Sequence, residues 1–115
     1  MTERRSRSFA LTPELLRAYS RRGNFHSDPS AAAAIGLSGL VAQGMQAAAP
    51  AYGLLLDAWG EDWLEHGELE LHFVAPVLGG ETVHAAVDVD GDAAQIEVTA
   101  GVDDVRVVGR ARRRA

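Results

Sequence analysis

The chain has 115 residues, a length that fits one domain and excludes a two-domain enzyme, a complete dinucleotide-binding fold and an α/β barrel. Because the sequence contains no cysteine, disulfides, zinc–thiolate sites and cysteine nucleophiles are excluded as well. The net charge is −5, yet the basic residues are all arginines near the two ends, and none lies between Gly23 and Val105.

The two basic ends have two interpretations. In the first, the arginines serve solubility. In the second, they contact an anion, such as the phosphates of coenzyme A or an acidic carrier protein. Residues 1–6 and 112–115 are expected to be disordered. The acidic middle has no basic and aromatic face, so nucleic acid is not an expected partner. No apolar run is long enough for a membrane span and no apolar signal region follows residues 1–7, so we expect a cytoplasmic protein that contacts no membrane.

A short strand and a helix are predicted at the start of the chain. The strand is predicted at residues 8–11. Thr12-Pro13-Glu14 is typical of a helix start, because threonine caps the first turn, proline fits the first helical position and an acid favours the positive end. This helix is expected to run to about Tyr19, and a loop is expected at 21–26.

Two further helices and one extra turn are predicted next. Asp28-Pro29-Ser30 repeats the cap-and-proline pattern and opens a short helix at 31–35. Residues 44–59 are apolar on nearly every side, which predicts a helix that the rest of the domain buries. Pro50 is expected to kink this helix, Gly60 to end it, and residues 61–66 to add one more turn.

The second half of the chain alternates polar and apolar residues, which is typical of strands with one buried face. Four strands are expected, at 68–75, at 81–90, around 96–100 and at 105–111, with turns rich in glycine and aspartate between them. The economical arrangement is an α+β domain in which a curved antiparallel sheet wraps around the apolar helix at 44–59.

Several short motifs together resemble one known family. His26-Ser27-Asp28-Pro29 is followed by Gln43-Gly44-Met45, and Phe73-Val74-Ala75-Pro76-Val77 is followed by Gly80-Glu81-Thr82-Val83. This combination, which spans roughly residues 19–89, resembles the MaoC-like acyl dehydratases, also called (R)-specific enoyl-CoA hydratases. The resemblance implies a single hot-dog domain over residues 1–115, with a sheet wrapped around a buried central helix. It also implies a hydratase or dehydratase that acts on an acyl thioester.

Addition of water to an α,β-unsaturated thioester needs a base for the water, an acid for Cα and donors for the thioester oxygen. By the resemblance, His26 is the catalytic residue that holds or activates the water, and the N–H of Gly44 holds the thioester oxygen. The first N–H groups of a helix are unpaired and lie at its positive end, and glycine allows a close approach. Asn24, Gln43 and Met45 are implied as substrate-binding residues.

The sequence departs from the family pattern at the catalytic acid. The family's aspartate lies five residues before the histidine, where this chain has Arg21, or Arg22 if one residue is deleted. Arginine is not a base at neutral pH, but its charge suits a carboxylate or phosphate, so both arginines are substrate-binding candidates. Asp28, which stands before proline at a helix start, is interpreted as an N-cap.

Two other functions therefore stay open. One is a non-catalytic hot-dog subunit that binds a thioester or completes the active site of a homologous partner. The other is a hot-dog thioesterase or a specialised natural-product enzyme, although the acids Asp57 and Glu61 lie at the far end of the central helix. So short a chain favours a homodimer or a heteromer with a homologous subunit. No metal and no cofactor are expected beyond coenzyme A or phosphopantetheine as the substrate carrier, with an acyl carrier protein as a further partner.

Two histidines of the predicted strands and two aromatic residues of the apolar helix are expected to have structural roles. His72 and His84 fall on the polar side of their strands and are expected to face solvent. Tyr52 and Trp59, on the apolar helix, are expected to lie in the core.

Overall fold

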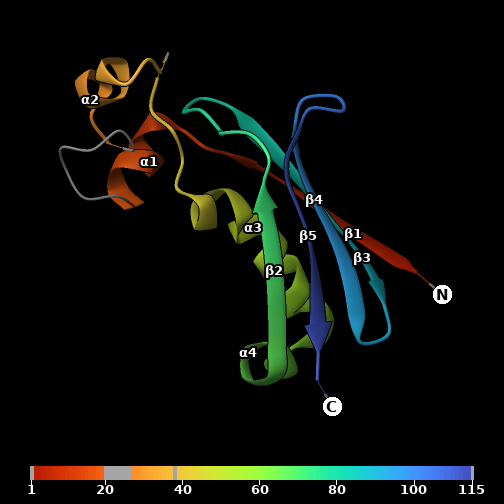
Figure 1. Ribbon diagram of the computed structural model, residues 1–115. Coiled ribbons are helices and arrows are strands. Elements are labelled where there is room, and N and C mark those ends of the chain that lie inside the picture. The colour runs from red at the N-terminus through yellow and green to blue at the C-terminus, as the bar shows by residue number, and fades with distance from the viewer. Residues whose placement is uncertain (1, 20–26, 38, 115) are drawn as a thin grey trace.

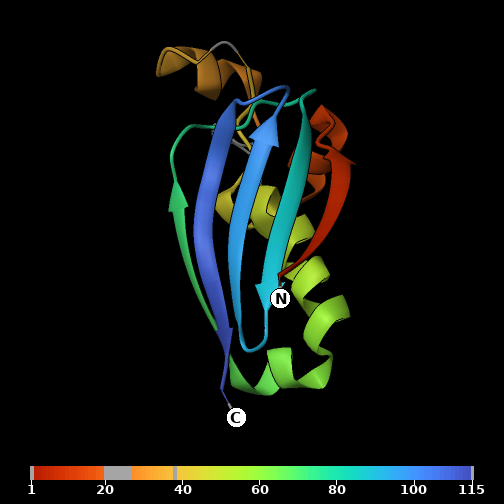
Figure 2. The same ribbon diagram turned by 90° about the vertical axis from the view of Figure 1, so that its right-hand side faces the viewer.

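The computed structural model describes residues 2–19, 27–37 and 39–114 (Figure 1). Five antiparallel strands form one sheet in the order β1-β3-β4-β5-β2, and Figure 2 shows them side by side with the helix α3 behind them. The predicted α+β fold, an antiparallel sheet around a central helix, is therefore confirmed. In chain order the elements are β1 (Glu3–Ala10), α1 (Pro13–Tyr19), α2 (Pro29–Ala34), α3 (Gly44–Trp59), α4 (Glu61–His66), β2 (Gly67–Phe73), β3 (Thr82–Asp90), β4 (Ala93–Ala100) and β5 (Val105–Arg113).

The helix ends follow the capping signals in the sequence. The hydroxyl of Thr12 accepts a hydrogen bond from the Leu15 N–H at 3.2 Å, and the carboxylate of Asp28 accepts one from the Ser30 N–H at 2.9 Å. Asp28 is thus the N-cap of α2, as predicted. At the end of α3, Gly60 adopts a positive φ of 62°, which glycine reaches without steric cost.

The core lies between α3 and the sheet. Alanines and leucines of α3 pack onto valines of β3 and β4, and all of these side chains are almost completely withdrawn from water. Small alanine side chains let the helix approach the sheet closely, so that the larger leucines and valines fill the remaining space. The residues of this contact include Ala47, Ala51, Leu54, Leu55, Val83, Val87 and Val98.

One face of α3 is exposed, which corrects the prediction of a helix buried on every side. Met45, Tyr52 and Leu56 are exposed by 48%, 36% and 37%. The helix packs against β3, β1 and β4 and only slightly against β5, so the face that turns away from these strands is left uncovered. The prediction of a core position is wrong for Tyr52 but confirmed for Trp59, whose indole N–H donates to the Gly91 carbonyl at 3.1 Å.

The prediction of disorder at residues 1–6 and 112–115 is wrong for most of these residues, because residues 3–6 belong to β1 and residues 112–113 to β5. Arg4 in β1 donates two hydrogen bonds of 2.8 Å to the carboxylate of Asp88 in β3. Arg112 in β5 pairs with Glu68 in β2 at 2.7 Å. Opposite charges on neighbouring strands stabilise strand pairing, so these arginines contact carboxylates of the sheet itself.

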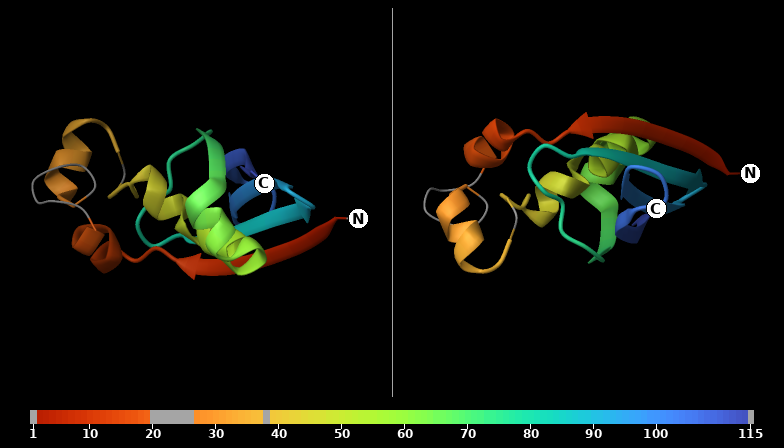
Figure 3. Two further views of the ribbon diagram at one scale, coloured as in Figure 1. Left: turned by 90° about the horizontal axis from the view of Figure 1, so that it is seen from below. Right: turned by 90° about the horizontal axis from the view of Figure 1, so that it is seen from above.

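The two short helices α1 and α2 lie together at one end of the molecule, next to the start of α3 (Figure 3). Leu16 of α1 is completely buried. The side-chain amide of Gln46, in α3, donates a hydrogen bond to the Leu15 carbonyl of α1 at 3.0 Å. None of the described helices is long and apolar enough to cross a membrane.

Candidate active site at the start of α3

The first turn of α3 presents free backbone donors. Gln43 is the N-cap and Gly44 the first helical residue, and the Gln43 side chain makes no capping hydrogen bond. The N–H groups of Gln46 and Ala47 donate to the Gln43 carbonyl at 3.0 and 3.1 Å, whereas those of Gly44 and Met45 have no acceptor among the described residues. These two donors lie at the positive end of a 16-residue helix, where negative charge is favoured.

An apolar hollow of about 510 Å³, which we call the α3 hollow, lies beside this turn. Its described lining contains no charged or hydrogen-bonding side chain. A volume of roughly 300–1,000 Å³ with mainly apolar walls is typical of sites for small molecules. The hollow and the free N–H groups together suit a ligand with an apolar chain and a carbonyl oxygen. The lining residues are Val41, Ala42, Gly44, Ala47, Phe73, Val74, Ala75, Pro76, Val77 and Val107.

Phe73 covers Gly44 directly. A Cβ atom added to Gly44 would lie 2.8 Å from Cζ of the Phe73 ring and 3.0 Å from Cε1. Real Cβ atoms do not approach other atoms that closely, so a larger residue at position 44 requires the ring to move. Glycine at this position is therefore explained by the packing of Phe73, in addition to the accessible N–H.

Backbone hydrogen bonds fix the wall at residues 74–77. The Ala42 N–H donates to the Val77 carbonyl at 2.8 Å, which joins this wall to the segment before α3. On the other side, the Val74 N–H donates to the carbonyl of Arg106 in β5 at 2.8 Å. The wall is thus held between the sheet and the segment that leads into the helix.

The side chain of Arg106 ties the same wall to the sheet. Its guanidinium donates to both carboxylate oxygens of Glu81 at 2.7 Å, to the Pro76 carbonyl at 2.7 Å and to Asp104 at 2.8 Å. These hydrogen bonds lower the pKa of the Glu81 and Asp104 carboxyls and raise the pKa of Arg106. All three groups therefore stay charged near neutral pH and hold the loop between β2 and β3 in place.

The predicted site residues fall into two groups. Gln43, Gly44 and Met45 lie together at the start of α3, where Gly44 lines the α3 hollow and Met45 is half exposed. The positions of the others relative to Gly44 stay predictions, because these residues lie outside the described part of the chain. They are His26, Asn24, Arg21 and Arg22.

Three residues near the site were not predicted from the sequence. Phe73 belongs to a quoted motif, but nothing in the motif places its ring over Gly44. Arg106 could have been suspected as a charge within an apolar strand, and Gln46 as a polar residue in an apolar helix. Only the folded contacts reveal that both fix the surroundings of the first turn of α3.

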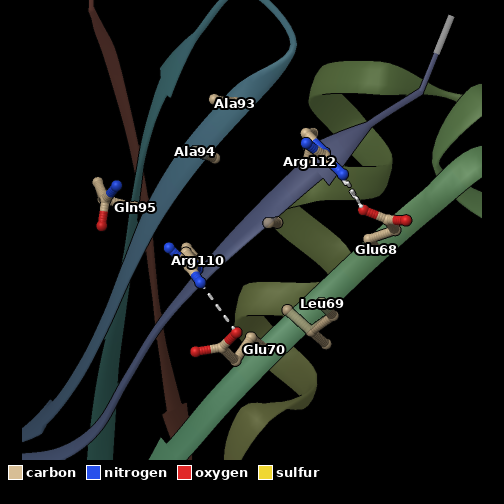
Figure 4. Close-up of a pocket in the computed structure, with 9 residues that line it drawn as sticks. Glu68, Leu69, Glu70, Ala93, Ala94, Gln95, Arg110 and Arg112 are labelled. Atoms are coloured by element: carbon tan, nitrogen blue, oxygen red, sulfur yellow. Dashed lines mark hydrogen bonds and ion pairs between the residues drawn. The ribbon is translucent and has the colours of Figure 1, made fainter.

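A second hollow, of about 520 Å³, lies on the sheet between β2, β5 and β4 (Figure 4). Two ion pairs line it: Arg110 with Glu70 at 3.1 Å and Arg112 with Glu68 at 2.7 Å. Each of these four charges already has a partner, so none of them is left for an incoming ion. Because no predicted site residue lines this hollow either, we take the α3 hollow as the candidate site.

The histidines of the strands are exposed, as predicted. His72 Nε2 lies 3.0 Å from a Glu70 oxygen, and His84 Nδ1 lies 2.7 Å from the Ser8 hydroxyl, both on the open surface. Within the described residues, no group of three His, Asp or Glu side chains comes together as a metal site requires.

A five-stranded antiparallel sheet wrapped around one long helix defines the hot-dog fold. The family described as MaoC like domain matches residues 3–109, and the chain belongs to this family. Among curated proteins, none matches the sequence significantly.

Solved structures share the fold over almost the whole chain. The (R)-hydratase of A. caviae involved in PHA biosynthesis has a TM-score of 0.78 and 20% identity, with 95% of this chain and 91% of that chain covered. The HadBC (3R-hydroxyacyl-ACP dehydratase) complex of Mycobacterium tuberculosis has a TM-score of 0.73 and 20% identity, with 96% and 92% covered. The ChsH1-ChsH2 complex of the same organism has a TM-score of 0.75 and 13% identity, with 96% and 94% covered.

Proposed function

We propose that the protein binds an acyl thioester of coenzyme A or of an acyl carrier protein at the start of α3, and adds or removes water at the 2,3-position. The observation that carries this proposal is a pair of N–H groups, at Gly44 and Met45, that have no acceptor among the described residues and lie beside the apolar α3 hollow. A thioester offers a carbonyl oxygen to such donors and an apolar chain to such a hollow. Membership of the MaoC-like family supports the same class of substrate.

During the reaction, negative charge develops on the thioester oxygen, which is the atom that these N–H groups are proposed to bind. When the water oxygen bonds to Cβ, a base takes the proton that the water loses, and the electron pair of the double bond moves toward the thioester oxygen. The electron pair then returns, and an acid delivers a proton to Cα. The N–H of Gly44 donates to this oxygen, and the positive end of α3 stabilises it further. One donor of this kind contributes about 10²–10³-fold to kcat in enzymes that stabilise an oxyanion.

His26 is the proposed group that holds the water. Of the described residues before and after it, the Leu15 carbonyl of α1 accepts a hydrogen bond from Gln46 of α3, and Asp28 caps α2. This hydrogen bond joins α1 to the first turn of α3. The further proposed substrate contacts are Arg21, Arg22, Asn24, Gln43 and Met45.

A second candidate function is a subunit that binds the thioester while a homologous partner supplies the catalytic acid. The observation in its favour is the arginine that replaces the family's aspartate, at Arg21 or Arg22. An arginine cannot take up a proton at neutral pH, so this chain lacks one half of the acid–base pair. The structural similarity to HadBC, which is a complex of two chains, fits this candidate.

Both candidates include a second hot-dog subunit beside β2. β2 is an edge strand, and its inward-facing Leu69, Leu71 and Phe73 are only partly covered. Together with the uncovered face of α3, they form an apolar flank that another subunit would bury. The opposite edge, β1, carries Arg4, Arg5 and Arg7, and such charges discourage strand pairing.

A thioesterase is supported less well. Asp57 forms an ion pair with Arg7 at 3.1 Å near the far end of α3, and Glu61 begins α4 beyond it. Neither carboxylate lines the α3 hollow, so neither is placed to activate a water there.

The test is hydration of short 2-enoyl-CoA thioesters by the wild-type protein, by His26→Ala and by the matched variant His72→Ala. We expect turnover by the wild type and by His72→Ala, and loss of turnover in His26→Ala with an unchanged fold. If the chain is the non-catalytic subunit, activity will appear only after a homologue with the aspartate–histidine pair is added. Absence of both turnover and thioester binding, alone and in such mixtures, would overturn the proposal.

A further inference from the structure

Phe73 closes one side of the α3 hollow, directly over the residue whose N–H the proposed function uses. Phe73 is the last residue of β2, and its Cζ lies 2.8 Å from the position of a Cβ on Gly44. The residue is nevertheless 51% exposed, so the ring is not locked into the core. A side chain in this position narrows the hollow beside Gly44, and its exposed part belongs to the apolar flank at β2.

The other walls of the hollow are less able to change its size. The alanines and valines that face it have short side chains, and the backbone at Val74 and Ala75 is held by two hydrogen bonds to the Arg106 carbonyl, at 2.8 and 3.3 Å. Among the described lining residues, Phe73 is the one with an aromatic ring. The dimension of the hollow next to Gly44 therefore depends mainly on this side chain.

We infer that Phe73 determines the length of the acyl chain that the site accepts, and that the intact ring restricts the site to short chains. The inference rests on the proposed function, because it places the thioester carbonyl at Gly44. A chain that continues from this carbonyl into the hollow meets the Phe73 ring. Removal of the ring leaves room for further methylene groups, each of which raises affinity by about fourfold when it is buried.

The test compares Phe73→Ala with wild type and with Phe9→Ala. Phe9 is a matched control because it is also a partly exposed phenylalanine, in β1, and does not line the hollow. Binding of butyryl-, hexanoyl-, octanoyl- and decanoyl-CoA is measured by calorimetry, so that the result does not depend on turnover. We expect wild type and Phe9→Ala to favour the short chains, and Phe73→Ala to shift the octanoyl-to-butyryl affinity ratio by about tenfold or more toward octanoyl.

An unchanged length preference in Phe73→Ala would overturn the inference while leaving the proposed function intact. If wild type binds no acyl-CoA of any length, the proposed function fails, and free fatty acids of the same lengths then test Phe73 alone. A gain for longer acids in Phe73→Ala would support the size limit, and no gain would overturn it. Circular dichroism checks the fold, and Phe73→Val serves in the same assays if Phe73→Ala does not fold.

Discussion

Arg106 and Glu81 form a bidentate ion pair, with two hydrogen bonds of 2.7 Å that join β5 to the residue before β3. The pair lies behind the wall of the α3 hollow, because Arg106 also donates to the Pro76 carbonyl. The two side chains are exposed by only 11% and 28%, so water screens their attraction less than it screens surface pairs. The shape of the candidate site therefore depends on a charge pair that does not itself line the α3 hollow.

Replacement of Glu81 by glutamine should destabilise the fold, because the largely buried guanidinium of Arg106 then has an uncharged and weaker partner. Hydrogen bonds to charged groups contribute about 1.5–3 kcal/mol, so we expect a loss of about 2 kcal/mol and a fall in Tm of about 10 °C. Glu70→Gln makes the same change in the exposed pair with Arg110 and should leave Tm unchanged. Equal falls in Tm for both variants would contradict this account.

The same pair predicts how stability depends on pH. The hydrogen bond from Arg106 lowers the pKa of Glu81 in the folded state, so the stabilisation is fully present above the ordinary glutamate pKa of about 4.3. It is lost as the pH falls through the lowered folded-state pKa. Glu81→Gln should therefore lose less stability than wild type between neutral and strongly acidic pH, as measured by urea denaturation at each pH.

Gly67, the first residue of β2, lies directly against Trp63 of α4. An added Cβ would collide with both the indole ring and the carbonyl oxygen of Trp63, and the backbone cannot yield as a flexible side chain can. We expect Gly67→Ala to cost about 1–3 kcal/mol of the free energy of unfolding. Gly39→Ala is the matched control, since a Cβ there meets nothing within 4 Å. Equal stability of Gly67→Ala and Gly39→Ala in denaturation would contradict the close contact between Gly67 and Trp63.

Two substitutions of Asp28 distinguish a capping role of its carboxylate from a catalytic role. Its carboxylate accepts the Ser30 N–H at the start of α2, and asparagine caps helices as well as aspartate does. Asp28→Asn should therefore keep both stability and turnover, whereas Asp28→Ala should lose about 1 kcal/mol of stability. Loss of turnover in Asp28→Asn with an unchanged Tm would instead identify Asp28 as the acid that the sequence otherwise lacks.

The proposed subunit interface makes a prediction about size in solution. Leu56 lies on the uncovered face of α3, and a glutamate there would bury a charge between subunits. We expect light scattering to give a dimer mass for wild type and a monomer mass for Leu56→Glu. Val102→Glu, in the exposed turn between β4 and β5, should remain a dimer. A monomeric wild type, or a dimeric Leu56→Glu, would exclude a homodimer through this interface.

The secondary structure was largely predictable because local signals fix it. Thr12, Asp28 and Gly60 mark helix ends through their own side chains or backbone freedom, and these signals act over only a few residues. The paired ends were not predictable in the same way. Arg4 and its partner Asp88 are 84 positions apart in the sequence, so only the strand order brings them together.

The site was predictable only in part. Gly44 was found by resemblance, but its contact with Phe73 depends on how β2 passes the start of α3. The exposed face of α3 was missed because hydrophobicity is the same for a residue in the core, such as Leu55, and for one that faces a hollow or a second subunit, such as Leu56. A pattern of apolar residues identifies surfaces that avoid water and does not identify what covers them.

The central claim, that the Gly44 N–H holds the thioester oxygen, is tested most directly by comparing Gly44→Pro with Gly44→Ala. Both variants add a Cβ beneath Phe73, but only proline removes the N–H. Proline is favoured at the first position of a helix, and Gln43, with ψ of 149°, already has the extended conformation that precedes proline. In the active assembly, kcat for hydration of a 2-enoyl thioester should be about 100-fold lower in Gly44→Pro than in Gly44→Ala. Equal kcat values for the two folded variants would contradict the claim.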